Sequence, residues 1–128
     1  MSRYLLAVFS AGVWMNLSEF IRNELLLKDT WVDGFKDIGL SFPSEPLNGA
    51  VWALWAFIFV AFLTMVSTKF DVISSTIISW SLGFVLLWVA VWNMGILPSG
   101  LLYWAVPWSF VEVYVAALII SRIVVRHN

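Results

Sequence analysis

The stretch Gly12–Leu27, GVWMNLSEFIRNELLL, decides how the rest of the chain is interpreted. It begins as an apolar segment and continues, with no further glycine or proline to break it, into Glu19, Arg22 and Glu24. Charged side chains inside a helix that crosses a lipid bilayer are costly, so they need a partner, a cavity or an interface. This stretch therefore predicts a membrane helix with a polar end.

The composition is typical of a membrane protein with several spans. Of the 128 residues, 62% are hydrophobic and 12% are charged, whereas soluble domains have about 45–50% apolar and about 25% charged residues. The length accommodates a single transmembrane domain, 1–128. The net charge of −1 gives no indication of a nucleic acid partner. The absence of cysteine excludes disulfides and thiolate metal sites.

Four segments are long enough to cross the hydrocarbon, which takes about 20 residues. We expect spans at 4–27, 48–68, 72–96 and 101–125. Each must be helical because lipid offers the backbone no other hydrogen-bonding partner. The first run lacks a small-residue cleavage site, so we expect it to be retained. Because the links at 69–71 and 97–100 are short, the predicted fold is an all-α, antiparallel four-helix bundle.

The long loop, 28–47, is predicted to contain a short amphipathic helix that lies on the membrane surface. One helical face of this segment is apolar and consists of Trp31, Phe35 and Ile38. Another face is acidic and consists of Asp29, Asp33 and Asp37. The acidic face could bind a divalent cation, but a solvated surface is the simpler interpretation, and we assign no metal site.

Basic residues near the ends of the spans predict the orientation. The side that holds both termini carries Arg3, Lys69, Arg122 and Arg126. The opposite side carries Arg22, Lys28 and Lys36, diluted by several carboxylates. Because basic residues accumulate on the cytoplasmic side, we expect a multi-pass protein of the cell (inner) membrane with both termini in the cytoplasm.

Tryptophan is concentrated toward the end of the bundle that this topology places outside. The pairs in the last three spans are Trp52 and Trp55, Trp88 and Trp92, and Trp104 and Trp108. An aromatic belt would enrich both interfaces, so two interpretations stay open. One is a belt combined with packing, and the other is an aromatic-walled cavity open to the outer leaflet.

Polar side chains converge on the same end. Asn16 and Glu19 share a face of the first span, while Asn93 and Tyr103 lie near the outer ends of later spans. Glu112 lies about eleven residues into the last span, near mid-membrane at about 1.5 Å per residue. Pro107 is expected to kink the helix just before Glu112.

Two interpretations account for this polar cluster. Arg22 could bridge Glu19 and Glu112 in a purely structural network, or the cluster could form the polar end of a binding pocket. A neutral Glu112 bonded to a carbonyl freed by Pro107 would likewise need no function.

Most enzyme chemistry is not indicated. The single histidine, His127, is next to the C-terminus, so a histidine-ligated haem or zinc inside the membrane is not expected. No nucleophile–base pair or glycine-rich phosphate loop is recognisable. We therefore expect no enzymatic activity and no cofactor.

The leading hypothesis is a bundle that binds a lipid-like or other amphiphilic small molecule from the outer leaflet, with membrane lipids as partners. Its expected site residues are Asn16, Glu19, Arg22, Trp52, Trp55, Trp88, Trp92, Asn93, Tyr103, Trp108 and Glu112. The alternatives are proton-coupled transport of a small molecule by a homodimer, and an accessory subunit of a larger membrane complex.

The layout is similar to small four-helix bacterial membrane proteins of unknown function. The points of likeness are the polar end of the first span, Leu25-Leu26-Leu27 with a nearby aromatic residue, and Pro107 with Glu112 in the last span. The resemblance covers most of the chain and implies no activity. The segment Leu97–Tyr103 also resembles the Pro-Thr-Gly-x-x-Tyr stretch of small multidrug transporters. Because it precedes the fourth span and does not lie inside the second, we transfer no residue role from that family.

Overall fold

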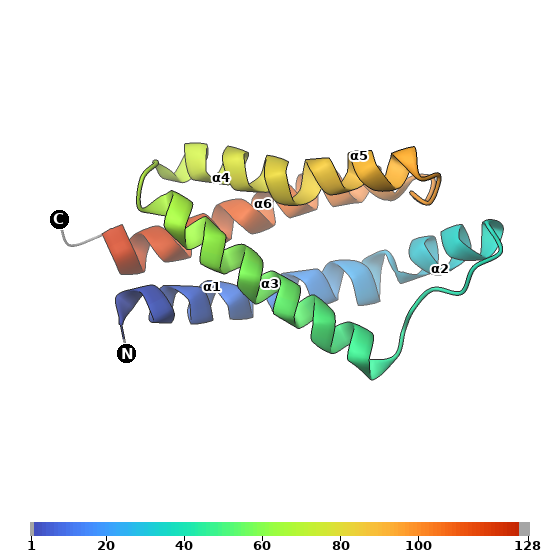
Figure 1. Cartoon of the computed structure of the whole chain (residues 1–128), viewed down its shortest axis with the longest axis horizontal. Coiled ribbons are helices and arrows are strands. Elements are labelled where there is room, and N and C mark those ends of the chain that lie inside the picture. Colours follow the sequence, from blue (N-terminus) through green and yellow to red (C-terminus); the bar gives the residue numbers. More distant parts are fainter. Residues whose placement is uncertain (1, 126–128) are drawn as a thin grey trace.

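The computed structural model describes residues 2–125, apart from the side chain of Val125, and shows a bundle of four long helices with a short helix at one end (Figure 1). The first span is α1 (Arg3–Phe20) continued by the π-helical turn η1 (Ile21–Leu26), and the short helix α2 (Lys28–Asp37) follows. The second span is α3 (Pro46–Ser67). The third consists of α4 (Val72–Trp80), η2 (Ser81–Val85) and α5 (Leu86–Asn93), and the fourth of α6 (Leu101–Ile120) and η3 (Ser121–Val125).

These helices confirm the predicted all-helical class, and four of them are long and apolar enough to cross a membrane. Between residues 2 and 125 no strand is present. The largest difference from the predicted spans is at the third, which ends at Asn93 and not at residue 96. Gly95 explains this earlier end, because its φ of 75° places it in the left-handed region that terminates helices.

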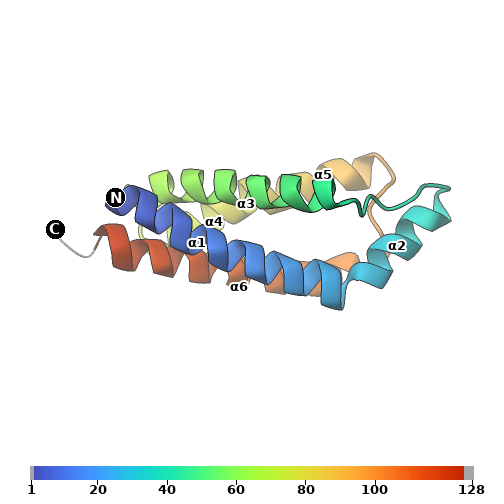
Figure 2. The same cartoon turned by 90° about the horizontal axis from the view of Figure 1, so that it is seen from below.

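Successive spans run antiparallel. The start of α1, the α3–α4 turn and the end of α6 lie at one end of the bundle, whereas α2 and the α5–α6 link lie at the other (Figures 1 and 2). The identity of the membrane and the side on which the termini lie stay predictions. Arg126 and His127, which entered the sequence argument, lie outside the described residues.

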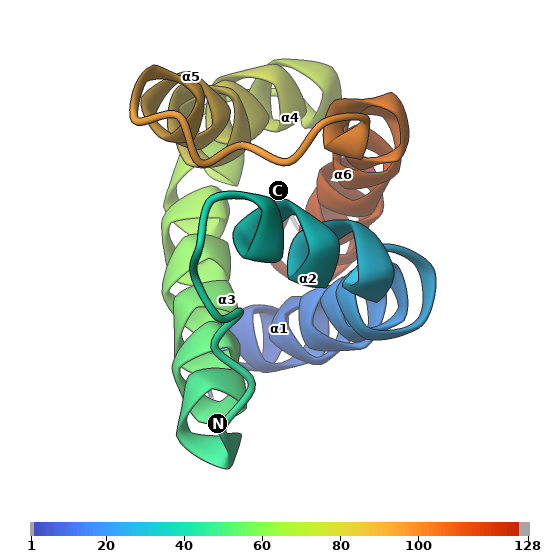
Figure 3. The same ribbon diagram turned by 90° about the vertical axis from the view of Figure 1, so that its right-hand side faces the viewer.

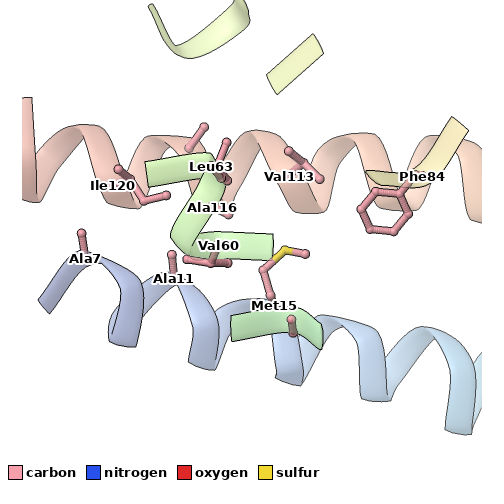
Figure 4. Packing of buried hydrophobic residues seen from close by; sticks show 11 residues of the cluster. Ala7, Ala11, Met15, Val60, Leu63, Phe84, Val113, Ala116 and Ile120 are labelled. Carbon is pink, nitrogen blue, oxygen red and sulfur yellow. The ribbon is translucent and has the colours of Figure 1, made fainter. Parts of the chain in front are cut away.

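Small side chains form much of the buried core between α1, α3 and α6 (Figure 4). Its members include Ala7, Ala11, Met15, Ala56, Val60, Val113, Ala116 and Ala117. Small residues let membrane helices approach closely, and packing then drives their association. Gly12 and Gly83 extend this principle, because a Cβ at either position would overlap the ring of Phe57 or Phe59, respectively.

The predicted helix in the long loop is present as α2, and it covers the end of the bundle (Figure 3). Gly34 lies directly against Pro98 in the α5–α6 link, where a Cβ would overlap the proline. Trp31 packs against the buried Leu27 and Leu101. Ile38 falls just beyond the helix and is exposed, because Gly39 (φ 78°) ends the element. The location of α2 on the membrane surface stays a prediction.

Candidate functional site

Three charged side chains, Glu19, Arg22 and Glu112, meet inside the bundle. Arg22 Nη2 donates to Glu19 Oε2 at 2.6 Å, and Arg22 Nη1 donates to Glu112 Oε2 at 3.2 Å. Arg22 is 5% exposed and Glu112 is 1% exposed. One guanidinium thus joins two carboxylates that come from the first and the last span.

The position of Arg22 follows from its helix. Glu19 and Arg22 are three residues apart, a spacing at which side chains on a helix are neighbours. Arg22 lies in η1, and its Cζ is 5.6 Å from the centroid of the Phe84 ring, which lies in η2. A cation over an aromatic face is attracted by the ring quadrupole. Two π-helical turns therefore bring the guanidinium and the ring into contact. Such turns often mark functional sites.

A hydrogen-bonded chain connects this triad to α2. Asn23 Nδ2 donates to Glu19 Oε2 at 3.1 Å, and Trp31 Nε1 of α2 donates to Asn23 Oδ1 at 3.2 Å. Glu19 Oε2 consequently accepts from both Arg22 and Asn23. The covering helix and the buried Glu112 belong to one continuous polar network.

Indole N–H groups join the spans around the triad. Trp14 Nε1 on α1 donates to the backbone carbonyl of Glu112 at 2.9 Å, and Trp108 Nε1 on α6 donates to Ser18 Oγ at 3.0 Å. Trp80 Nε1 on α4 donates to Ser109 Oγ at 2.9 Å. Hydrogen bonds between membrane helices contribute about 0.6 kcal/mol on average. Pro107 lies within α6, which continues on both sides of it.

One oxygen of each carboxyl group in the triad lacks a hydrogen-bond donor among the described residues. Oε1 of Glu19 and Oε1 of Glu112 are buried and accept no hydrogen bond from the residues that the structure describes. The side chains of Ser18 and Glu19 face the carboxyl group of Glu112. Buried polar atoms are normally satisfied, so an unsatisfied pair next to one cation requires a chemical explanation.

A groove of about 430 Å³ lies between α3 and the η2–α5 segment. It is lined by Trp55, Ile58, Phe59, Leu82, Gly83, Leu86 and Leu87. Trp55 and Phe59 stack with ring centroids 5.4 Å apart, and Phe84 packs edge-on against both, at 5.5 and 5.6 Å. Phe84 therefore contacts both Arg22 and two of the rings that line the groove, but it does not itself line the groove.

The structure brings some of the predicted site residues together. Glu19, Arg22 and Glu112 are in direct contact, and Trp108 reaches them through Ser18. Trp55 and Trp88 both pack against Phe84. These residues belong to or adjoin two sites, a buried polar triad and an apolar groove, and Phe84 contacts members of both.

Other predicted residues lie away from the triad. Asn16 Nδ2 donates to the carbonyl of Gly12 on its own helix at 2.9 Å. Trp52 packs edge-on against Trp55 but is itself exposed. The remaining three are also exposed, and they are Trp92 (71%), Tyr103 (78%) and Asn93.

Sequence reasoning did not identify Phe84, Phe59 or Ser18 as site residues. The one sequence signal for this region was Gly83, because a small residue in a membrane helix indicates that a neighbouring helix approaches closely. No pattern indicated Phe84, since its contact with Arg22 depends on two π-helical turns.

Known proteins supply no further guidance. No protein-family model, curated protein or solved structure matches the chain.

Proposed function

We propose that the protein binds an amphiphilic, lipid-like molecule whose apolar chain occupies the groove between α3 and η2–α5. The supporting observation is the groove itself, an open depression of about 430 Å³ lined by apolar side chains and Gly83. Ligand sites have volumes of about 300–1,000 Å³ and predominantly apolar linings. The groove lies between two helices that are each long enough to cross a membrane. In a membrane it would face the hydrocarbon, so the alkyl chain of a lipid is the occupant available to it.

The aromatic wall suits this occupant. Trp55 and Phe59 present stacked rings toward the groove, and the exposed Trp52 continues the wall through its contact with Trp55. Tryptophan at the end of a span is typical of the headgroup level of a bilayer. With the predicted orientation, Trp52 and Trp92 would lie beside the polar head of a molecule from the outer leaflet.

The triad contributes to this site indirectly. Arg22 holds the ring of Phe84 from one side, while Trp55 and Phe59 pack against other parts of the same ring. Arg22 does not line the groove, and its contact with Phe84 would support the two rings that do. The polar residues would act as positioning residues, with aromatic and aliphatic side chains contacting the ligand.

Native mass spectrometry of the detergent-solubilised protein with added phospholipid tests the proposal. Ile58, half-exposed at the groove, is replaced by tryptophan so that its larger side chain fills the space. Phe62→Trp, on the same helix but outside the groove, is the matched control. We expect one retained lipid for the wild type and for Phe62→Trp, and about tenfold weaker retention, equivalent to about 1.4 kcal/mol, for Ile58→Trp. Equal retention by all three proteins, or none by the wild type, would contradict the proposal.

A further inference from the structure

We infer that Glu19 and Glu112 together bind one exchangeable proton, so that the buried triad carries no net charge. The inference starts from a count of charges around the two carboxyl groups. Arg22 is the one basic side chain that contacts either of them in the described part of the chain. Two ionised carboxylates beside one guanidinium would leave a net negative charge in the low-dielectric interior, which is strongly unfavourable.

The other groups that face the triad do not supply a positive charge. They include Ser18 of α1, Asn23 of η1 and Phe84 of η2, all of them uncharged, and neither α3 nor α6 contains a basic residue. Lys28, the next basic residue along the chain, is exposed and pairs with Glu24 at 3.0 Å. The missing charge must therefore come from a bound ligand.

The unsatisfied oxygens indicate where this ligand binds. Each carboxyl group directs Oε2 toward Arg22, and each leaves Oε1 buried without a donor. A proton on one Oε1 converts that atom from an acceptor into a donor, which the other carboxyl group or Ser18 can then accept. Carboxyl groups that share a site in this way hold a common proton because they cannot both ionise. One proton thus satisfies the charge balance and the hydrogen bonds at once.

A metal cation fits the site less well. The guanidinium of Arg22 already contacts both carboxyl groups, and calcium takes six to eight oxygen ligands. Within residues 2–125 no group of three metal-binding side chains is present. The proton is therefore the ligand that the surroundings accommodate.

The two acids differ in their access to the exterior. The side chain of Glu19 is 14% exposed and that of Glu112 is 1% exposed. A proton can reach the pair through Glu19 and be held at Glu112, out of contact with the surroundings. Phe84 connects this site to the proposed lipid groove, but the charge count does not depend on a lipid, so loss of lipid binding would leave the inference unaffected.

Infrared spectroscopy of the full-length protein in a maltoside detergent tests the inference, with glutamate ¹³C-labelled at its side-chain carboxyl group. We expect a carboxylic acid C=O band at neutral pH that shifts with the label and again in D₂O. Glu112→Gln and Glu19→Gln should each remove the band. Glu24→Gln, which alters an exposed carboxylate of the same span, should leave it unchanged.

Three results would overturn the assignment. The first is the absence of a label-sensitive acid band from the wild type, which decides the matter even if a variant does not fold. The second is persistence of the band in either Glu112→Gln or Glu19→Gln. The third is a band that appears only when sodium is withheld, which would assign the site to a metal cation.

Discussion

Replacing Arg22 by methionine removes the cation from a buried network but keeps an unbranched side chain with a high helix propensity. Arg22 is 5% exposed and donates to both Glu19 and Glu112. Its loss would leave two buried carboxyl groups without their shared donor, and Phe84 without the guanidinium on its face. We expect a large decrease in the free energy of unfolding.

The size of this decrease follows from the burial. Removing one partner of a buried ion pair costs about 3–5 kcal/mol, because the remaining charge is uncompensated. Replacing the whole network by uncharged residues of similar volume is neutral or even stabilising in comparable cases. The triple variant Glu19→Gln/Arg22→Met/Glu112→Gln should therefore recover most of the stability that Arg22→Met loses.

Reversible unfolding in mixed micelles of mild detergent and dodecyl sulfate, followed by circular dichroism, measures these differences. Lys28→Met is the matched control, since Lys28 is 45% exposed in its pair with Glu24. An exposed pair at this spacing contributes about 0.3–0.5 kcal/mol. If Arg22→Met is no more destabilising than Lys28→Met, or if the triple variant is the least stable, the triad is not the central stabilising network described above.

Two further perturbations test the helix packing at Gly12 and the cap that Asp71 forms at the start of α4. Gly12→Val should lower the free energy of unfolding by about 1–3 kcal/mol, because its Cβ would overlap the ring of Phe57. Gly49→Val, where a Cβ meets open space, should cost less in the same unfolding assay. The backbone N–H and hydroxyl of Ser74 hold the pKa of Asp71 below its ordinary value of 3.8. Stability from Asp71 is therefore present above that value and lost as the pH falls through the lowered pKa. The melting temperatures of the wild type and Asp71→Asn should accordingly converge on acidification, and a constant difference would contradict this.

The spans were predictable because hydrophobic length is a strong signal. The short links then required neighbouring helices to run antiparallel. Glu19 and Arg22 were also recognisable as a pair from their spacing. A bridge from Arg22 to Glu112 was one of two interpretations that the sequence allowed, and the structure shows that bridge at 3.2 Å.

The orientation of side chains around each span was not predictable. A π-helical turn changes which residues share a face, and no residue pattern announced η1 or η2. The directions of Trp92 and Tyr103 depend on which helices are neighbours, and both point outward. The groove lies between α3 and η2–α5, and α3 and α5 diverge from each other (Figure 1). This divergence is a property of how the helices cross and not of either sequence alone.

The bonds between α1 and α6 have a consequence for biosynthesis. Arg22 and Glu112 are 90 residues apart, as are Trp108 and Ser18. The ribosome therefore makes the first span long before it reaches Glu112, and in a chain that inserts span by span Arg22 would enter the membrane during that interval. Throughout that interval Glu19, three residues away on the same helix, would keep Arg22 from being an isolated charge in lipid. The arrival of the last span would then complete the triad through Glu112.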